Sequence, residues 1–101
     1  MSRWTDETGI SPRTRARVMD RDGRQCVICL RTDSLQCAHV VRRSRGGKGV
    51  ETNLVMLCQD CHRELDFDPE KSKVLHKMIV DYLTDIYGEW DEKDQIFSKS
   101  R

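Results

Sequence analysis

CVIC at residues 26–29 and CQDCH at residues 58–62 are the two stretches that set the architecture of this chain. Two cysteines separated by two residues can bind one metal ion, and two such pairs complete the tetrahedral sulfur shell that zinc accepts. The 28 residues between the pairs exceed a minimal zinc ribbon and leave room for a whole hairpin. We therefore expect one structural zinc site, whose ligands are Cys26, Cys29, Cys58 and Cys61.

The composition indicates that the chain needs this metal. It has 101 residues, of which 37% are hydrophobic and 35% are charged, which predicts one domain with little material for a core. Structural zinc binding contributes about 10–16 kcal/mol of apparent free energy coupled to folding, so we expect the metal-free chain to be largely unfolded or molten. The odd number of cysteines, five, and their Cys-x-x-Cys pairing favour metal ligation over disulfides.

The net charge of +1 conceals an asymmetry along the chain. Residues 1–50 hold 11 Lys and Arg against 5 Asp and Glu, whereas residues 51–101 hold 7 against 12. The N-terminal half can therefore attract a phosphate backbone although the whole chain is nearly neutral. No apolar run follows Met1 and no stretch approaches membrane-spanning length, so we expect a soluble cytoplasmic protein without a membrane partner.

The first element that we expect is a short helix over about residues 12–20, because Ser11-Pro12 combines a capping residue with the residue favoured at the first helical position. Arg13, Arg17 and Arg21 follow one another at intervals of four and form one positive stripe on that helix. Such a stripe is either a solvated face or a contact surface for phosphates. We predict DNA contact for Arg13 and Arg17.

Between the cysteine pairs, alternating residues predict a strand over 35–41 and a returning strand over 53–57, followed by a helix that starts at the second pair. The loop between the strands combines four cations with three glycines, a composition that suits close approach of a backbone to phosphates. An ordinary exposed loop is the alternative. The cations of this loop, and predicted DNA contacts, are Arg42, Arg43, Arg45 and Lys48.

The second half of the chain predicts a long core helix. Asp68-Pro69 is a second cap and helix start, and apolar residues at intervals of three and four continue to about Tyr87, with Gly88 as the stop. We expect residues 1–10 to be a flexible N-terminus, residues 11–88 to be a single zinc-stapled domain, and residues 89–101 to be a disordered charged tail.

Three polar residues between and beside the cysteines could carry chemistry. Hydrolysis of a phosphodiester needs a general base for the attacking water and a cation beside the scissile phosphate. His39 is the candidate base, because a neutral imidazole titrates near pH 7. His62 is the candidate ligand of a catalytic ion, and Asn53 could orient the base or complete the metal shell. Each signal is weak alone, as His76 illustrates, since its place between apolar helix positions predicts only a solvated side chain.

The order of these residues is more specific than any one of them. The segment CAHVVRRSRGG at residues 37–47, followed by NLVMLCQDCH at residues 53–62, resembles the HNH endonuclease family. The resemblance covers about Cys26 to Asp66 and implies an α+β fold with a ββα-metal motif on a zinc-stapled treble-clef scaffold, flanked by the N-terminal helix and the longer C-terminal amphipathic helix. It implies that His39 is the general base, Asn53 the central Asn, and His62 a ligand of the catalytic divalent ion.

The segment departs from the family at one position. Many members place Asp or His directly before the base as a second metal ligand, and this chain has Ala38 there. Asp66, four residues after His62, is where some members carry another ligand. We expect weak metal affinity without DNA, with Mg²⁺ or Mn²⁺ as the catalytic ion. Cys37 is expected to be a small buried hydrophobe.

These observations favour a metal-dependent DNA endonuclease or nicking enzyme that leaves 5′-phosphate and 3′-hydroxyl ends. Contacts to the backbone fix position without reading sequence, so a small monomer should have weak specificity. The alternative is a DNA-binding or adaptor module that has lost its catalytic ion, and a third interpretation is a protein-interaction domain. Small chains of this family are often encoded by phages, some beside DNA-packaging genes. DNA-processing partners in a host cytoplasm would therefore suit this chain.

Overall fold

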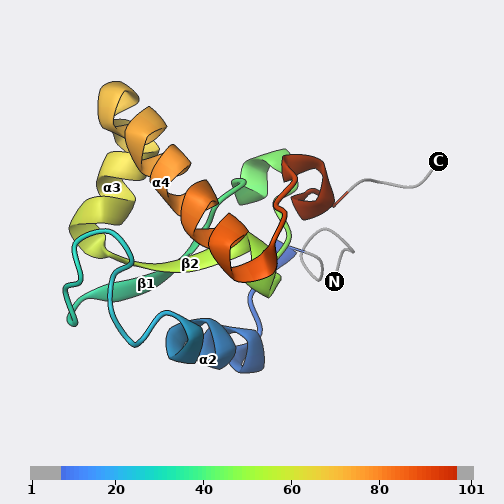
Figure 1. Cartoon of the computed structure of the whole chain (residues 1–101), viewed down its shortest axis with the longest axis horizontal. Coiled ribbons are helices and arrows are strands. Elements are labelled where there is room, and N and C mark those ends of the chain that lie inside the picture. Colours follow the sequence, from blue (N-terminus) through green and yellow to red (C-terminus); the bar gives the residue numbers. More distant parts are fainter. Residues whose placement is uncertain (1–7, 98–101) are drawn as a thin grey trace.

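A computed structural model describes residues 8–97 of the chain as an α+β structure (Figure 1). Residues 1–7 and 98–101 lie outside the described part. The helices are α2 (Pro12–Arg21), α3 (Gln59–Phe67) and α4 (Pro69–Tyr87), and the strands are β1 (Leu35–His39) and β2 (Leu54–Cys58). Short 3₁₀ helices occupy Arg43–Arg45, Glu51–Asn53 and Glu92–Gln95. Within residues 8–97 no helix is long and apolar enough to cross a membrane.

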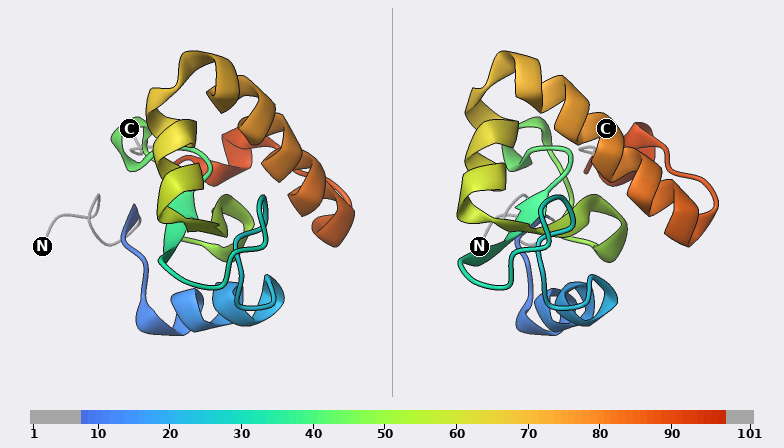
Figure 2. Two further views of the ribbon diagram at one scale, coloured as in Figure 1. Left: turned by 90° about the vertical axis from the view of Figure 1, so that its left-hand side faces the viewer. Right: turned by 60° about the vertical axis from the view of Figure 1, so that its left-hand side comes forward.

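The two strands pair antiparallel, with Leu35 opposite Cys58 and His39 opposite Leu54. Helix α2 covers one face of this hairpin, and α3 with α4 covers the other, as the turned views show (Figure 2). All five residues of β2 are buried because both of its faces are covered. On the α2 face Val18 packs with Leu54 and Met56. The core on the other face is made by Ala38, Val55, Leu57, Leu65, Leu75, Ile79 and Leu83.

The helix starts and stops predicted from sequence are confirmed. The Ser11 side chain accepts a hydrogen bond from the Thr14 amide at 3.1 Å, and Pro12 begins α2. The Asp68 side chain accepts from two amides in the first turn of α4, which ends where Gly88 adopts a φ of 87°. Strand β1 is shorter than expected and ends at His39, because the Val41 amide bonds to the side chain of Asn53 instead of to a strand.

The expectation of a disordered tail is wrong for residues 89–97. The Trp90 indole donates to the Thr52 carbonyl at 2.6 Å, and the Lys48 amide donates to the Gln95 carbonyl at 2.7 Å. The Phe97 amide donates to the Gly46 carbonyl at 2.6 Å, so this segment lies along the glycine-rich loop. The tail expectation failed because these bonds use loop backbone atoms, which local charge composition does not reveal. Residues 98–101 lie outside the described part.

A truncation after Gly88 should show what this segment does. We expect the zinc-bound chain to stay folded but to lose about 3 kcal/mol of unfolding free energy. The three hydrogen bonds above disappear, together with those of Glu92 with Arg45 and of Gln95 with Thr52 and the packing of Trp90. Urea unfolding measures the loss, and faster hydrogen exchange at the Lys48 amide places it at the loop. A truncation after Phe97 is the matched control. Unchanged exchange at Lys48 would show that the loop is ordered without the segment.

Candidate active site and zinc centre

Four cysteines from two separate parts of the chain form a compact cluster. The Sγ atoms of Cys26, Cys29, Cys58 and Cys61 all lie within 4.8 Å of one another, and those of Cys29 and Cys58 are 3.6 Å apart. A zinc ion with Zn–S bonds of about 2.3 Å would place its sulfur ligands roughly 3.8 Å apart, so the cluster fits structural zinc. Within residues 8–97 no other group of three or more His, Cys, Asp or Glu ligand atoms is clustered in this way.

The surroundings of the sulfur atoms favour ligation of a cation. Burial by itself would raise the pKa of Cys26, but backbone hydrogen bonds with Cys29, Cys58 and Ile28 lower it to about 7. Burial raises the pKa of Cys61, and its sulfur neighbours raise it further. The Cys58 sulfur accepts from the Cys61 amide at the N-terminus of α3, the expected position for the second pair. Holding all four sulfur atoms in the thiolate form that binds metal therefore requires a cation between them.

Asn53 is completely buried and belongs to the loop rather than to the pocket. Its Oδ1 accepts from the Val41 amide at 2.8 Å, and its Nδ2 donates to the carbonyls of Lys48, at 2.9 Å, and Val41, at 3.2 Å. The Val40 amide in turn donates to the Asn53 carbonyl. Asn53 thus ties the end of β1 to the loop. The suggestion that its side chain completes a metal shell is wrong, and this placement makes Asn53 a positioning residue.

Replacing Asn53 should damage folding before chemistry. Asn53→Ala leaves the amide of Val41 and the carbonyl of Lys48 buried without partners, so we expect a loss of about 2–4 kcal/mol in unfolding free energy. Asn53→Asp keeps the acceptor for Val41 but sets a buried carboxylate against the carbonyls of Val41 and Lys48, so it should destabilise the fold at least as much as Asn53→Ala. Thermal unfolding of the zinc-loaded variants measures the order. Equal stability of all three proteins would contradict this role.

His39 ends β1 and is half-buried, with its Nε2 2.8 Å from the Thr8 carbonyl oxygen. Because a carbonyl can only accept, Nε2 carries the proton and the lone pair lies on Nδ1. Burial lowers the pKa of His39, and the charges of Arg43 and His62 lower it further, against the opposing effect of the Thr8 bond. The ring is therefore neutral at pH 7 and has one basic nitrogen. Arg43 Nε also donates to the Thr8 hydroxyl at 3.2 Å.

His62 and Asp66 lie one turn apart on α3. The carbonyl oxygen of the Gln36 side chain accepts from Nδ1 of His62, which leaves the Nε2 lone pair 3.4 Å from Oδ2 of Asp66. These two atoms can bind a divalent ion only as an open site, in which water and phosphate supply the other ligands. Ala38 is buried and adds no ligand atom.

The candidate base and these two ligands share one pocket. It has a volume of about 290 Å³ and opens at the edge of β1. Its walls are Cys37, His39, Arg42, Arg43, His62, Asp66 and Phe67. The two histidines therefore face the same space although they come from different elements.

Comparison with known families agrees with this geometry, since the family model described as HNH endonuclease matches residues 26–66. Residues 26–66 are therefore similar to the HNH endonuclease family. The match runs from the first zinc ligand to Asp66, the extent expected from the sequence, so the HNH segment contains β1, β2 and α3 in the order ββα. Helices α2 and α4 flank it. The chain has no significant match among the curated proteins or the solved structures.

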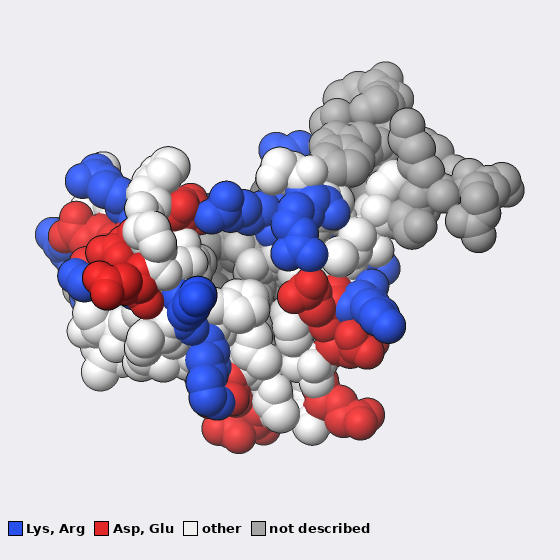
Figure 3. Space-filling model, turned by 90° about the horizontal axis from the view of Figure 1, so that it is seen from above, with Lys and Arg blue, Asp and Glu red and all other residues white. Residues whose placement is uncertain are grey.

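The pocket shared by His39, His62 and Asp66 is called the HNH pocket below. The cations around it differ in what they contact. Arg42 donates from Nη2 to the Asp66 carbonyl at 3.0 Å and lines the pocket beside Arg43. Arg45 pairs with Glu92 at 3.0 Å, outside this pocket. Lys48 lines none of the described pockets, and its backbone amide donates to the Gln95 carbonyl of the C-terminal segment. Seen from above, Lys and Arg side chains border a hollow in the surface, with Asp and Glu to either side (Figure 3).

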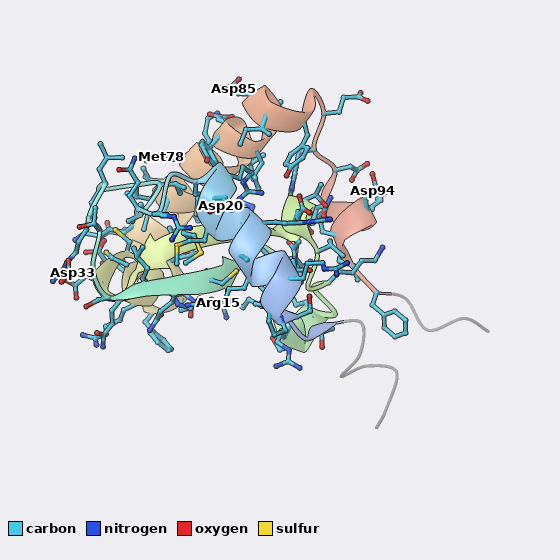
Figure 4. All side chains as sticks on the ribbon, turned by 90° about the horizontal axis from the view of Figure 1, so that it is seen from below. Arg15, Asp20, Asp33, Met78, Asp85 and Asp94 are labelled. Carbon is cyan, nitrogen blue, oxygen red and sulfur yellow. The ribbon has the colours of Figure 1, made fainter. Side chains whose placement is uncertain are left out.

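The arginine stripe of α2 is split by its contacts. Arg17 pairs with Glu51 at 3.0 Å and lies away from the HNH pocket. Arg21 is structural, because its guanidinium donates to the carbonyls of Leu54 and Glu51. Arg15 is exposed on α2, and its charge acts to lower the pKa of Cys37, which burial raises overall. Figure 4 shows Arg15 on the side of α2 toward β1. Arg13 is exposed on α2, outside the described pockets.

Sequence reasoning missed three parts of this site. The backbone of Thr8 has no side-chain signal, and the expectation of a flexible segment over residues 1–10 is wrong for the completely buried Thr8. Gln36 could have been found because alternation places it with Ala38 on the strand face that the following helix covers. Phe67, 79% exposed on the rim of the pocket, is an apolar residue at a helix end, which sequence alone cannot distinguish from a core residue.

Proposed function

We propose that this protein is a metal-dependent DNA endonuclease or nicking enzyme. It would hydrolyse phosphodiester bonds and leave 5′-phosphate and 3′-hydroxyl ends. The observation that carries the proposal is the shared pocket, in which the neutral imidazole of His39 faces the paired ligand atoms of His62 and Asp66 between two arginines. DNA is the substrate that the family of residues 26–66 implies.

Proton transfer in this scheme rests on His39. Its Nδ1 takes a proton from the attacking water, and the resulting imidazolium is held at Nε2 by the Thr8 carbonyl. The water oxygen bonds to phosphorus while the bond from phosphorus to the 3′ oxygen breaks, and solvent protonates the leaving oxygen. Mg²⁺ or Mn²⁺ held by His62 and Asp66 would supply stabilisation of the charge on the phosphate and the leaving oxygen.

DNA binding in this scheme is mostly electrostatic. Arg42 and Arg43 reach the scissile phosphate from the pocket wall, and Arg45 and Lys48 extend the basic surface along the loop. Arg13, Arg15 and Arg17 on α2 are the candidates for more distant phosphates. Because such contacts do not read bases, cleavage should show weak sequence preference, and binding should fall steeply with salt. The exposed ring of Phe67 offers an apolar surface for a sugar or base.

Supercoiled plasmid tests the proposal directly. Zinc-loaded protein freed of other metals should convert the plasmid to nicked or linear DNA only after Mg²⁺ or Mn²⁺ is added. Asp66→Ala should lower that rate at least tenfold at limiting metal, because one of two ligand atoms is lost. Asp60→Asn removes a carboxylate from the same helix outside the pocket, and is the matched control.

The adaptor alternative is favoured by one observation. Ala38 leaves the site with two protein ligand atoms, fewer than a tight metal site provides. If wild-type protein binds DNA but cuts none with any divalent metal, the chain is a DNA-binding module and the proposed hydrolysis is wrong. If Asp60→Asn and Asp66→Ala reduce cleavage equally, the assignment of the ion to His62 and Asp66 is wrong.

A further inference from the structure

A second pocket lies against the first and has no role in the chemistry described above. It has a volume of about 300 Å³ and shares His39, Arg42 and Asp66 with the first pocket. Its other polar walls come from the loop after β1 and from the first half of α4, which lies outside the matched segment. These added residues are Ser44, Arg45, Ser72 and His76.

Three of these side chains have unused hydrogen-bonding groups. Within residues 8–97 no partner is present for the hydroxyls of Ser44 and Ser72 or for the imidazole of His76. All three line the cavity, and Ser72 and His76 stand one turn apart on α4. Hydroxyl and imidazole groups that converge on a small open cavity beside arginines suit an oxyanion with several acceptor oxygens.

The charges of the second pocket also favour an anion. Arg42 uses one Nη2 bond to the Asp66 carbonyl, and Arg45 is paired only with Glu92 at the surface, where the two side chains are 59% and 45% exposed. A surface ion pair of this kind is weak, so a phosphate can compete for Arg45. The carboxylate of Asp66 is the negative charge in the lining of this pocket, and its Oδ2 lies toward His62 in the first pocket.

We propose that the second pocket binds the phosphate adjacent to the scissile phosphate on the same strand. Ser72 and His76 donate to its oxygens from α4, Ser44 donates from the loop, and Arg42 and Arg45 supply the charge. This assignment rests on the proposed function for the identity of the first phosphate. It gives α4 a part in substrate binding, and His76 is then more than the solvated residue expected from the sequence.

A minimal ligand can test this without any cleavage. Thymidine 3′,5′-bisphosphate carries two phosphates on one nucleoside, and the chain has three histidines, so imidazole NMR signals can be assigned with single variants. We expect saturable shifts of both His39 and His76 in zinc-loaded protein. Ser72→Ala and His76→Ala should each weaken binding about three- to tenfold, because each removes one hydrogen bond to a charged group.

Lys73→Ala is the matched control, because it removes a full positive charge from α4 at a residue that does not line the pocket. Its effect should be under about twofold, since an exposed charge is screened by salt. Shifts at His39 or His62 without any at His76 would overturn the second phosphate site and leave the nuclease proposal standing. The absence of any saturable shift at millimolar ligand would also overturn the second phosphate site. Shifts at His76 in a protein that never cuts DNA would keep the site and reject hydrolysis.

Discussion

Removing zinc is expected to unfold the chain. The cysteine cluster joins the turn at residues 26–31 to the end of β2 and the start of α3. The turn is otherwise held by the bond of the Val27 amide to the Met56 carbonyl, the pair of Arg31 with Asp60 and the packing of Val27 and Ile28 on the core. Zinc binding worth about 10–16 kcal/mol equals or exceeds the whole stability of a typical domain, which is about 5–15 kcal/mol. A chelator strong enough to strip zinc should abolish near-ultraviolet circular dichroism and cooperative thermal unfolding. Native mass spectrometry should find one zinc per folded chain.

Cys26→Ser should have the same effect as chelation, because Cys26 is fully buried and a hydroxyl is a poor zinc ligand. Cys37→Ser is the matched control. Cys37 is half-buried and lies outside the cluster, so this variant should keep both zinc and cooperative unfolding. A metal-free wild type with a full cooperative transition would show that the apolar core suffices and that the cluster is not the staple.

The sequence predicted the local features of this fold because each depends on residues close together in the chain. The Cys-x-x-Cys pairs, Ser11-Pro12, Asp68-Pro69 and Gly88 act within a few residues, and each lies where it was expected. The antiparallel pairing of the two strands agrees with the returning strand expected from the sequence, although residues 40–53 between them form a connection too long to require it. The order from His39 to His62 likewise indicated the ββα arrangement through its resemblance to a family whose model matches residues 26–66.

The features that the sequence did not predict depend on contacts between backbone atoms from distant parts of the chain. The Thr8 carbonyl at His39 and the Gln95 carbonyl at Lys48 belong to segments whose composition predicted flexibility. A carbonyl is common to every residue, so no residue type indicates such a bond. The expected stripe of Arg13, Arg17 and Arg21 was correct in spacing, but the partners Glu51 and Leu54 decide which arginine stays available.

Replacing His39 is the change expected to have the largest effect on activity. Within residues 8–97, His39 is the only histidine whose Nε2 donates to a backbone carbonyl, which leaves the lone pair of Nδ1 available as a base. His39→Ala removes this base. The nicking rate should fall by about 10²–10⁴, the usual contribution of a general base. The zinc cluster lies apart from this ring, so bound zinc and cooperative unfolding should remain. Nicking at the wild-type rate by folded His39→Ala would remove the base assignment.

The dependence of this rate on pH follows from the same ring. Burial lowers the pKa of His39 from its ordinary value of 6.5, and the base acts only when neutral. The rate should therefore be constant near neutral pH and fall as the pH drops through a midpoint below 6.5. Single-turnover nicking at saturating protein measures the midpoint. A midpoint above 6.5 would show that another group titrates.

Gly49→Ala tests the Thr8 bond while keeping His39 itself. A Cβ at Gly49 would lie 2.0 Å from the Gly9 carbonyl oxygen and 3.1 Å from that of Thr8, so the N-terminal segment must move away from the imidazole. Without its partner at Nε2 the ring loses its fixed tautomer, and the rate should fall by about tenfold or more at every pH. Val50→Ala, at an exposed neighbouring side chain, is the control. Equal rates for Gly49→Ala and Val50→Ala would mean that the Thr8 carbonyl does not orient the base, although His39 could still accept the proton.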